Sequence, residues 1–375
     1  MGIVGILVFA AVLSGLNYYL ARRLCQGLSL ILPWLRTGLV FALLSGLAVL
    51  TVLGFLRSML PLAPLWKKIL RFFFGWWLGI FLYLLMYTVL GDLVSLPLSL
   101  LLHGRKWALL RSILVLLLSA ATVVYGGIQA QRIHTVSYEV PVENCSPELS
   151  QMNIVLISDL HLGALGSEGR LEEIVTRINA LQPDLICIAG DFFDSDFSSI
   201  ADPLQAAETL KQLQSTHGVF ACLGNHDAGA TYPQMAAFLS GCGIRVLNDE
   251  SLRIGDHLIL AGRPDGSPIG GFGGLTRQAQ ASFPESPELP LIVLDHNPAN
   301  AESYGPGADL ILCGHTHKGQ IFPGSLITRR LFAVDYGYHR FPSGVQAVVT
   351  SGVGYWGIPL RIGSRCEIVQ IRLVP

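Results

Sequence analysis

Five short segments of the chain combine Asp, His and Asn at close spacing. They are Asp159-Leu-His161, Gly190-Asp191-Phe-Phe-Asp194, Gly224-Asn225-His226-Asp227, Asp295-His296-Asn297 and Gly314-His315-Thr316-His317. Carboxylate, imidazole and amide groups together suit first-row cations such as Mn, Fe or Zn. A single segment of this kind is usually a turn or a helix cap. Five of them in order along one half of the chain predict a metal site.

The carboxylates in these segments, and the nucleophile motifs that the sequence lacks, indicate which reaction such a metal site would carry out. One carboxylate can bridge two cations about 3.5–4 Å apart, and such a pair activates water and holds phosphoryl oxygens. The sequence has no Ser or Cys nucleophile motif and no Gly-x-x-x-x-Gly-Lys phosphate loop. We therefore expect two divalent ions (Mn, Fe or Zn) and a hydroxide nucleophile activated by them.

Each segment comes directly after a short apolar run that predicts a buried β-strand. These strands are expected at residues 153–158, 184–189, 219–223, 290–294 and 309–313, with others at 244–247, 258–261 and 346–350. Helical periodicity near residues 168–181, 203–214 and 232–239 adds strand–loop–helix repetition, which predicts an α/β domain with parallel strands. Because ligands gather at the carboxyl ends of parallel strands, the five segments are expected to meet at one site.

The first third of the chain predicts a helical membrane region. Four uncharged apolar stretches are each long enough to cross a bilayer core of about 30 Å as a helix. They span residues 2–21, 38–56, 72–90 and 112–130. The first lacks a basic start and a small-residue cleavage site, which favours a retained span over a signal peptide. The shorter apolar run 93–102 is expected to extend the third helix or to lie in the interface.

The charge balance differs between the two parts of the chain. Residues 1–130 contain ten Lys or Arg and one Asp, whereas residues 131–375 contain fifteen Lys or Arg and twenty-five Asp or Glu. An acidic domain repels polyanions, so we expect no nucleic-acid partner, and phosphate groups would need metal ions to be bound. The apolar fraction of 51% excludes a disordered chain.

These patterns predict three regions: a transmembrane helical region 1–130, a linker 131–150 and a catalytic domain 151–375. The predicted spans contain no charged residue, which argues against a transporter or channel and favours an anchor in the cell membrane. Six Lys or Arg flank one side of the four spans and five the other. This difference of one charge favours a catalytic domain outside the membrane.

The seven cysteines form no C-x-x-C pair. Cys187, Cys222 and Cys313 each lie in an apolar run that predicts a strand. We expect these three to be free thiols in the core. The odd total leaves at least one cysteine unpaired within the chain.

The ordered set DLH, GDFFD, GNHD, a separate His and GHTH resembles the calcineurin-like metallophosphoesterase family over residues 153–370. The extended GHTHKGQ and the later Gly352-Val-Gly-Tyr-Trp-Gly-Ile-Pro-Leu-Arg361 resemble the membrane-associated branch of that family. The apolar N-terminal region is similar to that of transmembrane proteins with a metallophosphoesterase domain. The resemblance implies an αββα sandwich with two mixed sheets.

The resemblance also implies a role for each segment. It assigns Asp159, His161 and His317 to a first metal ion and Asp191 to the bridging position. It assigns Asn225, His296 and His315 to a second ion. His226 would protonate the leaving group or steady the transition state, and Asp227 would orient it. Asp194 is expected to shape its loop or to support a metal ligand. The candidates for contact with the substrate are Lys318, Trp356 and Arg361; the alternatives are a solvated Lys318, which we favour, and ordinary packing of Trp356 and Arg361.

Together these observations predict a membrane-anchored, metal-dependent phosphoesterase. Its partners would be the lipid bilayer and a phosphodiester or pyrophosphate substrate, for which a lipid-linked or cell-envelope compound is a candidate. The apolar, glycine-rich stretch 269–275 is expected to be a surface loop; the alternatives are a mobile flap over the substrate and a loop that faces the membrane. The alternative is a non-catalytic metal-binding module that senses or scaffolds at the membrane. The motifs indicate neither which metals bind nor the oligomeric state.

Overall fold

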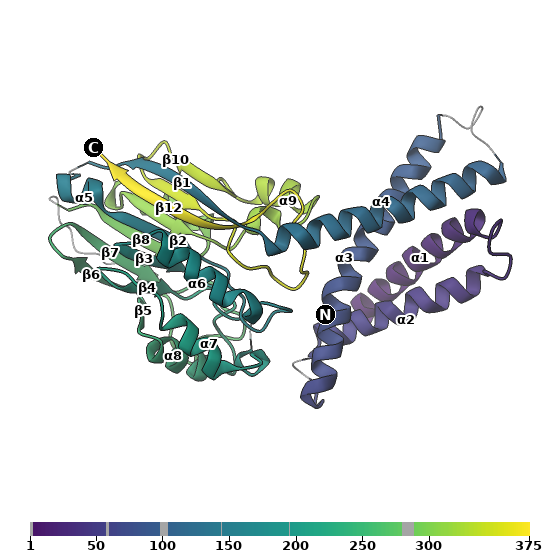
Figure 1. Cartoon of the computed structure of the whole chain (residues 1–375), viewed down its shortest axis with the longest axis horizontal. Coiled ribbons are helices and arrows are strands. Elements are labelled where there is room, and N and C mark those ends of the chain that lie inside the picture. The colour runs from purple at the N-terminus through teal and green to yellow at the C-terminus, as the bar shows by residue number, and fades with distance from the viewer. Residues whose placement is uncertain (1–2, 58–59, 98–103, 144, 195, 280–288) are drawn as a thin grey trace. The chain divides into compact units, whose positions relative to one another are not determined.

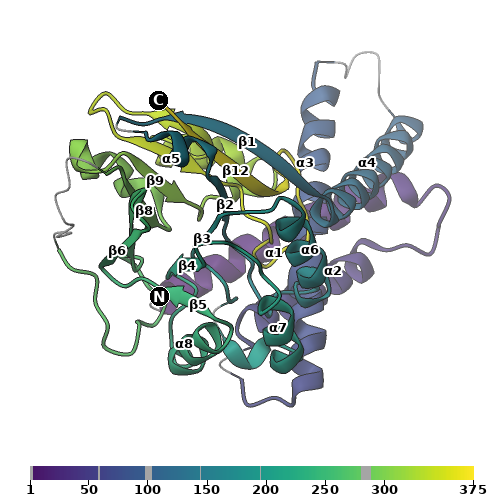
Figure 2. The same cartoon turned by 60° about the vertical axis from the view of Figure 1, so that its left-hand side comes forward.

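The computed structural model of the chain describes residues 3–57, 60–97, 104–143, 145–194, 196–279 and 289–375. It divides into two compact units, Met1–Gly127 and Ile128–Pro375 (Figures 1 and 2). The first unit consists of long helices, and the second contains two β-sheets with shorter helices. The change of architecture therefore falls where the composition of the sequence changes.

Four helices make up the first unit and are long and apolar enough to cross a membrane, as predicted. They are α1 (Ile3–Leu28), α2 (Thr37–Phe55), α3 (Pro64–Ser95) and α4 (Arg105–Gln131). Helices α3 and α4 begin earlier than the uncharged stretches, because Pro is favoured in the first turn and Lys and Arg are good helix formers. Of the run 93–102, the first residues extend α3, and residues 98–103 lie outside the described residues.

Asp92 on α3 is the single acidic residue of the helical unit, and it binds side chains from two other helices. Its carboxylate accepts hydrogen bonds from Tyr19 on α1 (2.7 Å) and Arg111 on α4 (2.5 Å), and it forms an ion pair with Arg23 on α1 (2.7 Å). A carboxylate in apolar surroundings is stable only when it is paired. This network therefore joins three helices, and it gives the charges at the ends of the apolar stretches a structural role.

The second unit is a sandwich of two six-stranded sheets. The first sheet has the order β1 (Ile133–Pro141), β12 (Cys366–Val374), β2 (Asn153–Ile157), β3 (Leu185–Ala189), β4 (Val219–Cys222) and β5 (Ile244–Val246). The second has the order β10 (Gly337–Arg340), β11 (Gln346–Val349), β9 (Leu310–Cys313), β8 (Leu291–Asp295), β7 (Leu258–Arg263) and β6 (Glu250–Ile254). Both are mixed, because β12, β10 and β6 each pair antiparallel with a neighbour. The two mixed sheets implied by the resemblance are confirmed.

Alternate residues of the central strands pack on opposite faces of the sheet. In β2, Ile154 and Leu156 lie in the core between the two sheets, whereas Val155 and Ile157 pack under the outer helices. Those helices are α6 (Leu171–Ala180), α7 (Pro203–Leu210) and α8 (Tyr232–Gly241), seen beside the first sheet in Figure 2. The 3₁₀ segment Pro298–Gly307 packs on the outer face of the second sheet. Burial on both faces explains why these strands are continuous apolar runs in the sequence.

The predicted linker 131–150 contains a strand and most of a short helix. Strand β1 pairs in parallel with β12 along nine residues, and α5 (Pro147–Gln151) comes after it. Only Arg132 separates α4 from β1. β1 is an edge strand whose alternate side chains are exposed and polar, so its composition resembles that of a linker.

The three cysteines predicted in strands are free and fully buried, as expected. Cys187, Cys222 and Cys313 lie on β3, β4 and β9. Burial raises the pKa of each thiol above its ordinary value. The thiols therefore stay protonated and pack as small apolar side chains.

Candidate metal centre

The five Asp-, His- and Asn-rich segments lie at the carboxyl ends of β2, β3, β4, β8 and β9. Three of these strands belong to the first sheet and two to the second. A hydrogen bond from His296 Nδ1 to the carbonyl oxygen of Ala189 (2.7 Å) joins the ends of β8 and β3. The segments therefore meet at one edge of the sandwich, as the rule for parallel strands predicts.

The loops hold several predicted ligands in a strained backbone conformation. Asp159, His161, Asp191, His315 and His317 all have positive φ angles between 49° and 70°. For a residue other than glycine, this conformation costs roughly 1–3 kcal/mol and persists where the surrounding structure fixes it. One such restraint is the hydrogen bond from the His161 N–H to the Asp191 carbonyl oxygen (3.1 Å). The local backbone thus orients the ligands at a cost in stability.

Glycine in three of the segments permits the close approach of neighbouring loops. A Cβ atom at Gly224 would collide with Asp191, and one at Gly314 would collide with Ser158 and Asp159. A Cβ atom at Gly190, where φ is +79°, would lie 2.6 Å from the backbone of Gly224. The glycines of these segments are therefore required by packing around the carboxylates.

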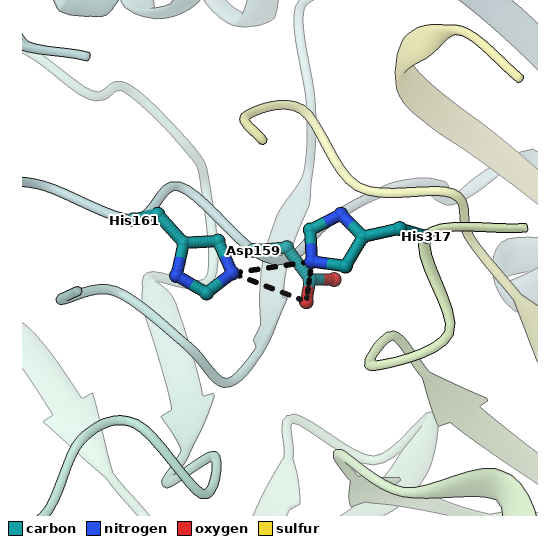
Figure 3. Close-up of side chains that lie close together, drawn as sticks. All are labelled: Asp159, His161 and His317. Carbon is teal, nitrogen blue, oxygen red and sulfur yellow. Dashed lines mark hydrogen bonds and ion pairs between the residues drawn. The ribbon is translucent and has the colours of Figure 1, made fainter. Parts of the chain in front are cut away.

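A first group of donors comprises Asp159, His161 and His317, which point toward one another in Figure 3. The Nε2 atoms of the two imidazoles are 3.2 Å apart. Asp159 Oδ1 lies 3.3 Å from His317 Nε2 and 3.8 Å from His161 Nε2. All three side chains are buried. Three donor atoms from two loops therefore converge on one point.

A second group comprises Asp191, His296 and His315, with Asn225 beside them. His296 Nε2 lies 3.1 Å from Asp191 Oδ2 and 3.2 Å from His315 Nδ1. His315 Nδ1 also lies 2.9 Å from Asn225 Oδ1. The bond from His296 Nδ1 to a carbonyl oxygen directs Nε2 into the group, as is usual for imidazoles that bind metals.

Asp191 lies between the two groups. Its Oδ2 atom is 3.1 Å from His296 of the second group and 3.8 Å from His161 of the first. Its Oδ1 atom accepts a hydrogen bond from the backbone N–H of His226 (2.8 Å). One carboxylate is therefore shared by both sets of imidazoles.

Burial sets the protonation of the imidazoles. It lowers the pKa of His161 to about 3 and that of His315 to about 4, and it lowers the pKa of His317 well below the ordinary value. Although burial acts in the same direction on His296, the nearby Asp191 raises its pKa well above that value. Most of these rings are therefore neutral at physiological pH, which is the form that binds a metal.

The residues fit divalent cations. Burial raises the pKa of Asp159 to about 6, so its charge is poorly compensated by the protein alone. Asp159 Oδ1 and His161 Nδ1 are buried without a hydrogen-bond partner among the described residues. In each group two ring nitrogens also face each other at 3.2 Å. A cation at each group would satisfy these donors, because carboxylate and imidazole together suit Mn, Fe or Zn.

His226 lies at the half-buried side of the centre. Its ring is 5.1 Å from that of His161 and 5.9 Å from that of Trp356, measured between ring centroids. Trp356 is 43% exposed, so it borders the centre on the solvent side. Asp194 Oδ1 lies 3.8 Å from His161 Nδ1, and a donor atom of each of Asp194, His161 and His226 lies within 4.8 Å of the others. Asp194 therefore lies closer to the chemistry than the sequence indicates.

Asp227 is fully buried beneath the loop that carries His226. Its carboxylate accepts hydrogen bonds from the backbone N–H groups of Gly224 (2.9 Å) and Phe193 (3.1 Å). Burial and the nearby Asp191 raise its pKa to about 7. These contacts brace two loops of the site through their backbones, whereas the sequence indicates a role in orienting the ring of His226.

Two of the three candidates for substrate contact are engaged with other residues of the protein. Arg361 is fully buried, where its guanidinium donates to the carbonyl oxygen of His317 (3.1 Å) and lies 3.1 Å from His317 Nδ1. It therefore holds a predicted metal ligand and does not reach the rim. Lys318 is half-buried, with its Nζ 3.9 Å from the centroid of the Tyr336 ring. Its ammonium is thus engaged in a cation–π contact.

The position of Arg361 makes it a positioning residue. Arg361→Met is expected to lower turnover about 10–100-fold and to weaken metal binding, because partners of a metal-bound imidazole have effects of this size. Excess metal should restore part of the turnover, and Arg361→Lys should be less impaired. Arg372→Met, at an exposed position of β12, is the matched control. A loss of turnover without any change in metal requirement would contradict this role.

Other supporting residues carry no recognisable sequence signal. Ser158 donates from its hydroxyl to Asp159 Oδ2. Arg277 forms a two-pronged ion pair with Asp295 (2.7 and 2.9 Å), and the Tyr304 hydroxyl also donates to that carboxylate (2.7 Å). Such pairs fix planar geometry, here directly before His296. Arg277 and Tyr304 lie 18 and 9 residues from Asp295 without any motif, so spacing alone does not reveal them.

The glycine-rich stretch 269–275 packs against the loop that carries His226. The Ile269 N–H donates to the Asn225 carbonyl oxygen (2.9 Å), and the Gly229 N–H donates to the Gly271 carbonyl oxygen (2.7 Å). Phe272 is buried, whereas Ile269 is 48% exposed. The stretch is therefore a packed wall of the site with an apolar residue at its surface.

The two-sheet fold and the converging Asp and His groups define a metal-binding α/β domain joined to candidate membrane helices. Residues 152–319 match the family model described as calcineurin-like phosphoesterase. The chain is 30% identical over 252 residues to an uncharacterized metallophosphoesterase of Aquifex aeolicus, covering 66% of this chain and 95% of that protein. The chain thus belongs to the calcineurin-like metallophosphoesterases, as the motifs indicate.

Two further relatives have names that refer to a membrane region or to a hydrolytic activity. A transmembrane protein with metallophosphoesterase domain from Danio rerio is 34% identical over 278 residues, covering 70% of this chain and 62% of that protein. This chain therefore spans about three fifths of that relative. UDP-2,3-diacylglucosamine pyrophosphatase LpxG of Chlamydia trachomatis is 26% identical over 288 residues, covering 60% of this chain and 84% of that protein.

Proposed function

We propose that this chain is a membrane-anchored, metal-dependent phosphoesterase that cleaves a phosphodiester or pyrophosphate bond. The observation that carries the proposal is the position of Asp191, whose Oδ2 lies within 3.1–3.8 Å of imidazoles from both donor groups. A shared carboxylate between two sets of ligands is the arrangement used to hold two cations side by side.

Seven residues would hold two divalent ions, Mn, Fe or Zn. The first ion would be held by Asp159, His161 and His317, the second by Asn225, His296 and His315, and Asp191 would contact both. When bound, such ions supply a nucleophilic hydroxide and neutralise the charge of the phosphoryl oxygens. Five of these seven side chains are buried and the other two are half-buried.

His226 would deliver a proton to the leaving group. Its half-buried ring lies next to the first donor group and faces the exposed Trp356, so it can reach a bound ester from the solvent side. Its backbone N–H is held by Asp191, and the loop that carries it is braced by Asp227. Proton transfer from a positioned imidazole contributes about 10²–10⁴-fold to a rate.

We further propose a substrate that is lipid-linked or belongs to the cell envelope. Four candidate membrane helices keep the site beside a bilayer. The relative LpxG is named for a pyrophosphatase activity on UDP-2,3-diacylglucosamine, which carries acyl chains. The basic residues that flank the helices, six against five, favour a catalytic unit outside the membrane.

The test measures hydrolysis of bis-p-nitrophenyl phosphate by the full chain in detergent. We expect removal of metal by a chelator to lower turnover at least about a hundredfold, because the ions supply several kcal/mol to the transition state. Adding back Mn, Fe or Zn should restore it, with Mg as the comparison. A folded, metal-loaded chain that hydrolyses neither this diester nor a nucleotide-sugar pyrophosphate would favour the non-catalytic sensory or scaffold role.

A further inference from the structure

Helix α9 (Gly324–Leu331) presents an apolar outer face to solvent. Leu326, Ile327 and Leu331 are 54, 60 and 72% exposed. The inner face is polar, because Ser325 is buried and the Thr328 hydroxyl donates to Asp335 Oδ2 (2.8 Å). A helix on the surface of a water-soluble domain normally has the reverse arrangement. The outer face of α9 is therefore suited to a non-aqueous neighbour.

The orientation of α9 is fixed at both ends. Before the helix, the backbones at Gly319 and Gly324 approach so closely that a Cβ atom on either would collide with the other. After the helix, the Phe332 ring packs on His315, with 5.9 Å between ring centroids. The exposed apolar face is thus set by packing and does not result from a loosely held loop.

Helix α9 is connected to the half-buried side of the metal centre. Gln320, between His317 and the helix, donates to the backbone carbonyl oxygen of Trp356 and accepts from its N–H, at 2.9 Å each. Trp356 in turn packs beside His226. The helix is therefore linked, through Gln320 and Trp356, to the side of the metal centre from which a substrate would reach His226.

The charge of this segment differs from that of the rest of its unit. Residues 318–332 contain Lys318, Arg329 and Arg330 and no acidic residue, whereas residues 131–375 as a whole carry twenty-five acidic and fifteen basic residues. Arg329 and Arg330 are exposed in the last turn of α9. Apolar and basic side chains on one exposed helix are typical of helices that lie in the interface of an anionic membrane.

We propose that the outer face of α9 lies in the headgroup region of the bilayer, so that phosphoesters reach the metal centre from the membrane surface. The connectivity supports this contact, because only Arg132 separates the candidate membrane helix α4 from strand β1. The membrane contact is independent of the proposed function. The statement that the substrate arrives from the membrane rests on that function.

The test uses the full chain reconstituted into vesicles of phosphatidylcholine, with and without phosphatidylglycerol. The photoreactive residue benzoylphenylalanine replaces Ile327 in one variant and Leu204 in the other. Leu204 on α7 is 81% exposed, so it is a matched apolar control on another helix of the same unit. After illumination, mass spectrometry identifies the crosslinked partners. We expect lipid adducts to be several-fold more abundant from position 327 than from position 204.

Two results would overturn the proposal. Equal yields of lipid adducts at both positions would show that α9 does not contact lipid in preference to other exposed helices. Crosslinks from position 327 mainly to residues 1–127 would show that the helical unit covers this face. The readout requires no turnover, so its failure is distinguishable from failure of the phosphoesterase function.

The proposed attraction between the arginines of α9 and anionic lipids is tested by a separate variant. The double variant Arg329→Gln and Arg330→Gln, combined with the probe at position 327, should give fewer lipid adducts in vesicles that contain phosphatidylglycerol. In vesicles of phosphatidylcholine alone the yield should not change, because the attraction to anionic headgroups is absent. An equal yield from both proteins in anionic vesicles would contradict a role for the two arginines.

Discussion

Asp191→Asn is expected to lower the turnover of a phosphate ester by about a thousandfold or more. The variant keeps the size of the side chain and an oxygen to accept the His226 N–H, so the loop should keep its shape. The variant loses the negative charge shared by the two donor groups. Cations held there supply several kcal/mol of transition-state stabilisation, and each 1.36 kcal/mol corresponds to a factor of ten in rate.

The matched control is Asp194→Asn. Asp194 contributes a carboxylate near the same centre, 3.8 Å from His161 Nδ1, and it is grouped with His161 and His226, whereas Asp191 lies beside His161 and also beside His296. We expect its loss to lower turnover about tenfold, in the range found for residues that support metal ligands. Turnover and metal content should be measured for both variants. Near-normal turnover and metal content of the Asp191→Asn variant would contradict a bridging role for Asp191.

His226→Ala is expected to show a defect that depends on the leaving group. For a diester with an alkyl leaving group, turnover should fall about 10²–10⁴-fold, because the positioned proton donor is lost. For bis-p-nitrophenyl phosphate the loss should be much smaller, since nitrophenolate leaves without protonation. Metal content should stay that of the unaltered chain.

The control for this variant is His217→Ala, which removes a histidine before β4, at the opposite end of the strand from the site. It should leave both activities unchanged. An equal loss with both classes of leaving group would indicate that His226 steadies the transition state or holds a metal. Either finding would replace the role of proton donor.

The site could be predicted from sequence because each donor lies directly after a strong strand signal. The runs before Asp159, Asp191 and His315 are buried on both faces of a sheet, which makes them continuous and apolar. Parallel strands then bring the residues after them to one edge of the sheet. The order of the segments carries the family resemblance, and the structure places the donor atoms within a few ångströms of one another.

Residues that support the site from a distance could not be predicted in the same way. Arg361, near the end of the chain, is a candidate for contact with the substrate or for ordinary packing, and it is buried against His317. Arg277 reaches Asp295 across 18 residues without any motif. Such contacts depend on how loops cross in three dimensions, and no local periodicity encodes them.

Three of the four strands missing from the sequence interpretation share one property. β1, β6 and β10 are edge strands with exposed polar side chains, so their apolar content is low. β12 lies inside the first sheet, yet it carries Glu367, Gln370 and Arg372, which mask its strand pattern. Its pairing with β1 and β2 brings together the two ends of the catalytic unit, a long-range contact that composition cannot reveal.

The most direct measurement is the metal content of the purified full chain, determined by elemental analysis after dialysis. We expect two divalent ions per chain, and loss of one ion in each of the variants His317→Ala and His315→Ala, which alter different donor groups. Arg372→Met should retain both. A single ion in the unaltered chain, or variants that retain the full complement, would contradict two sites joined by Asp191.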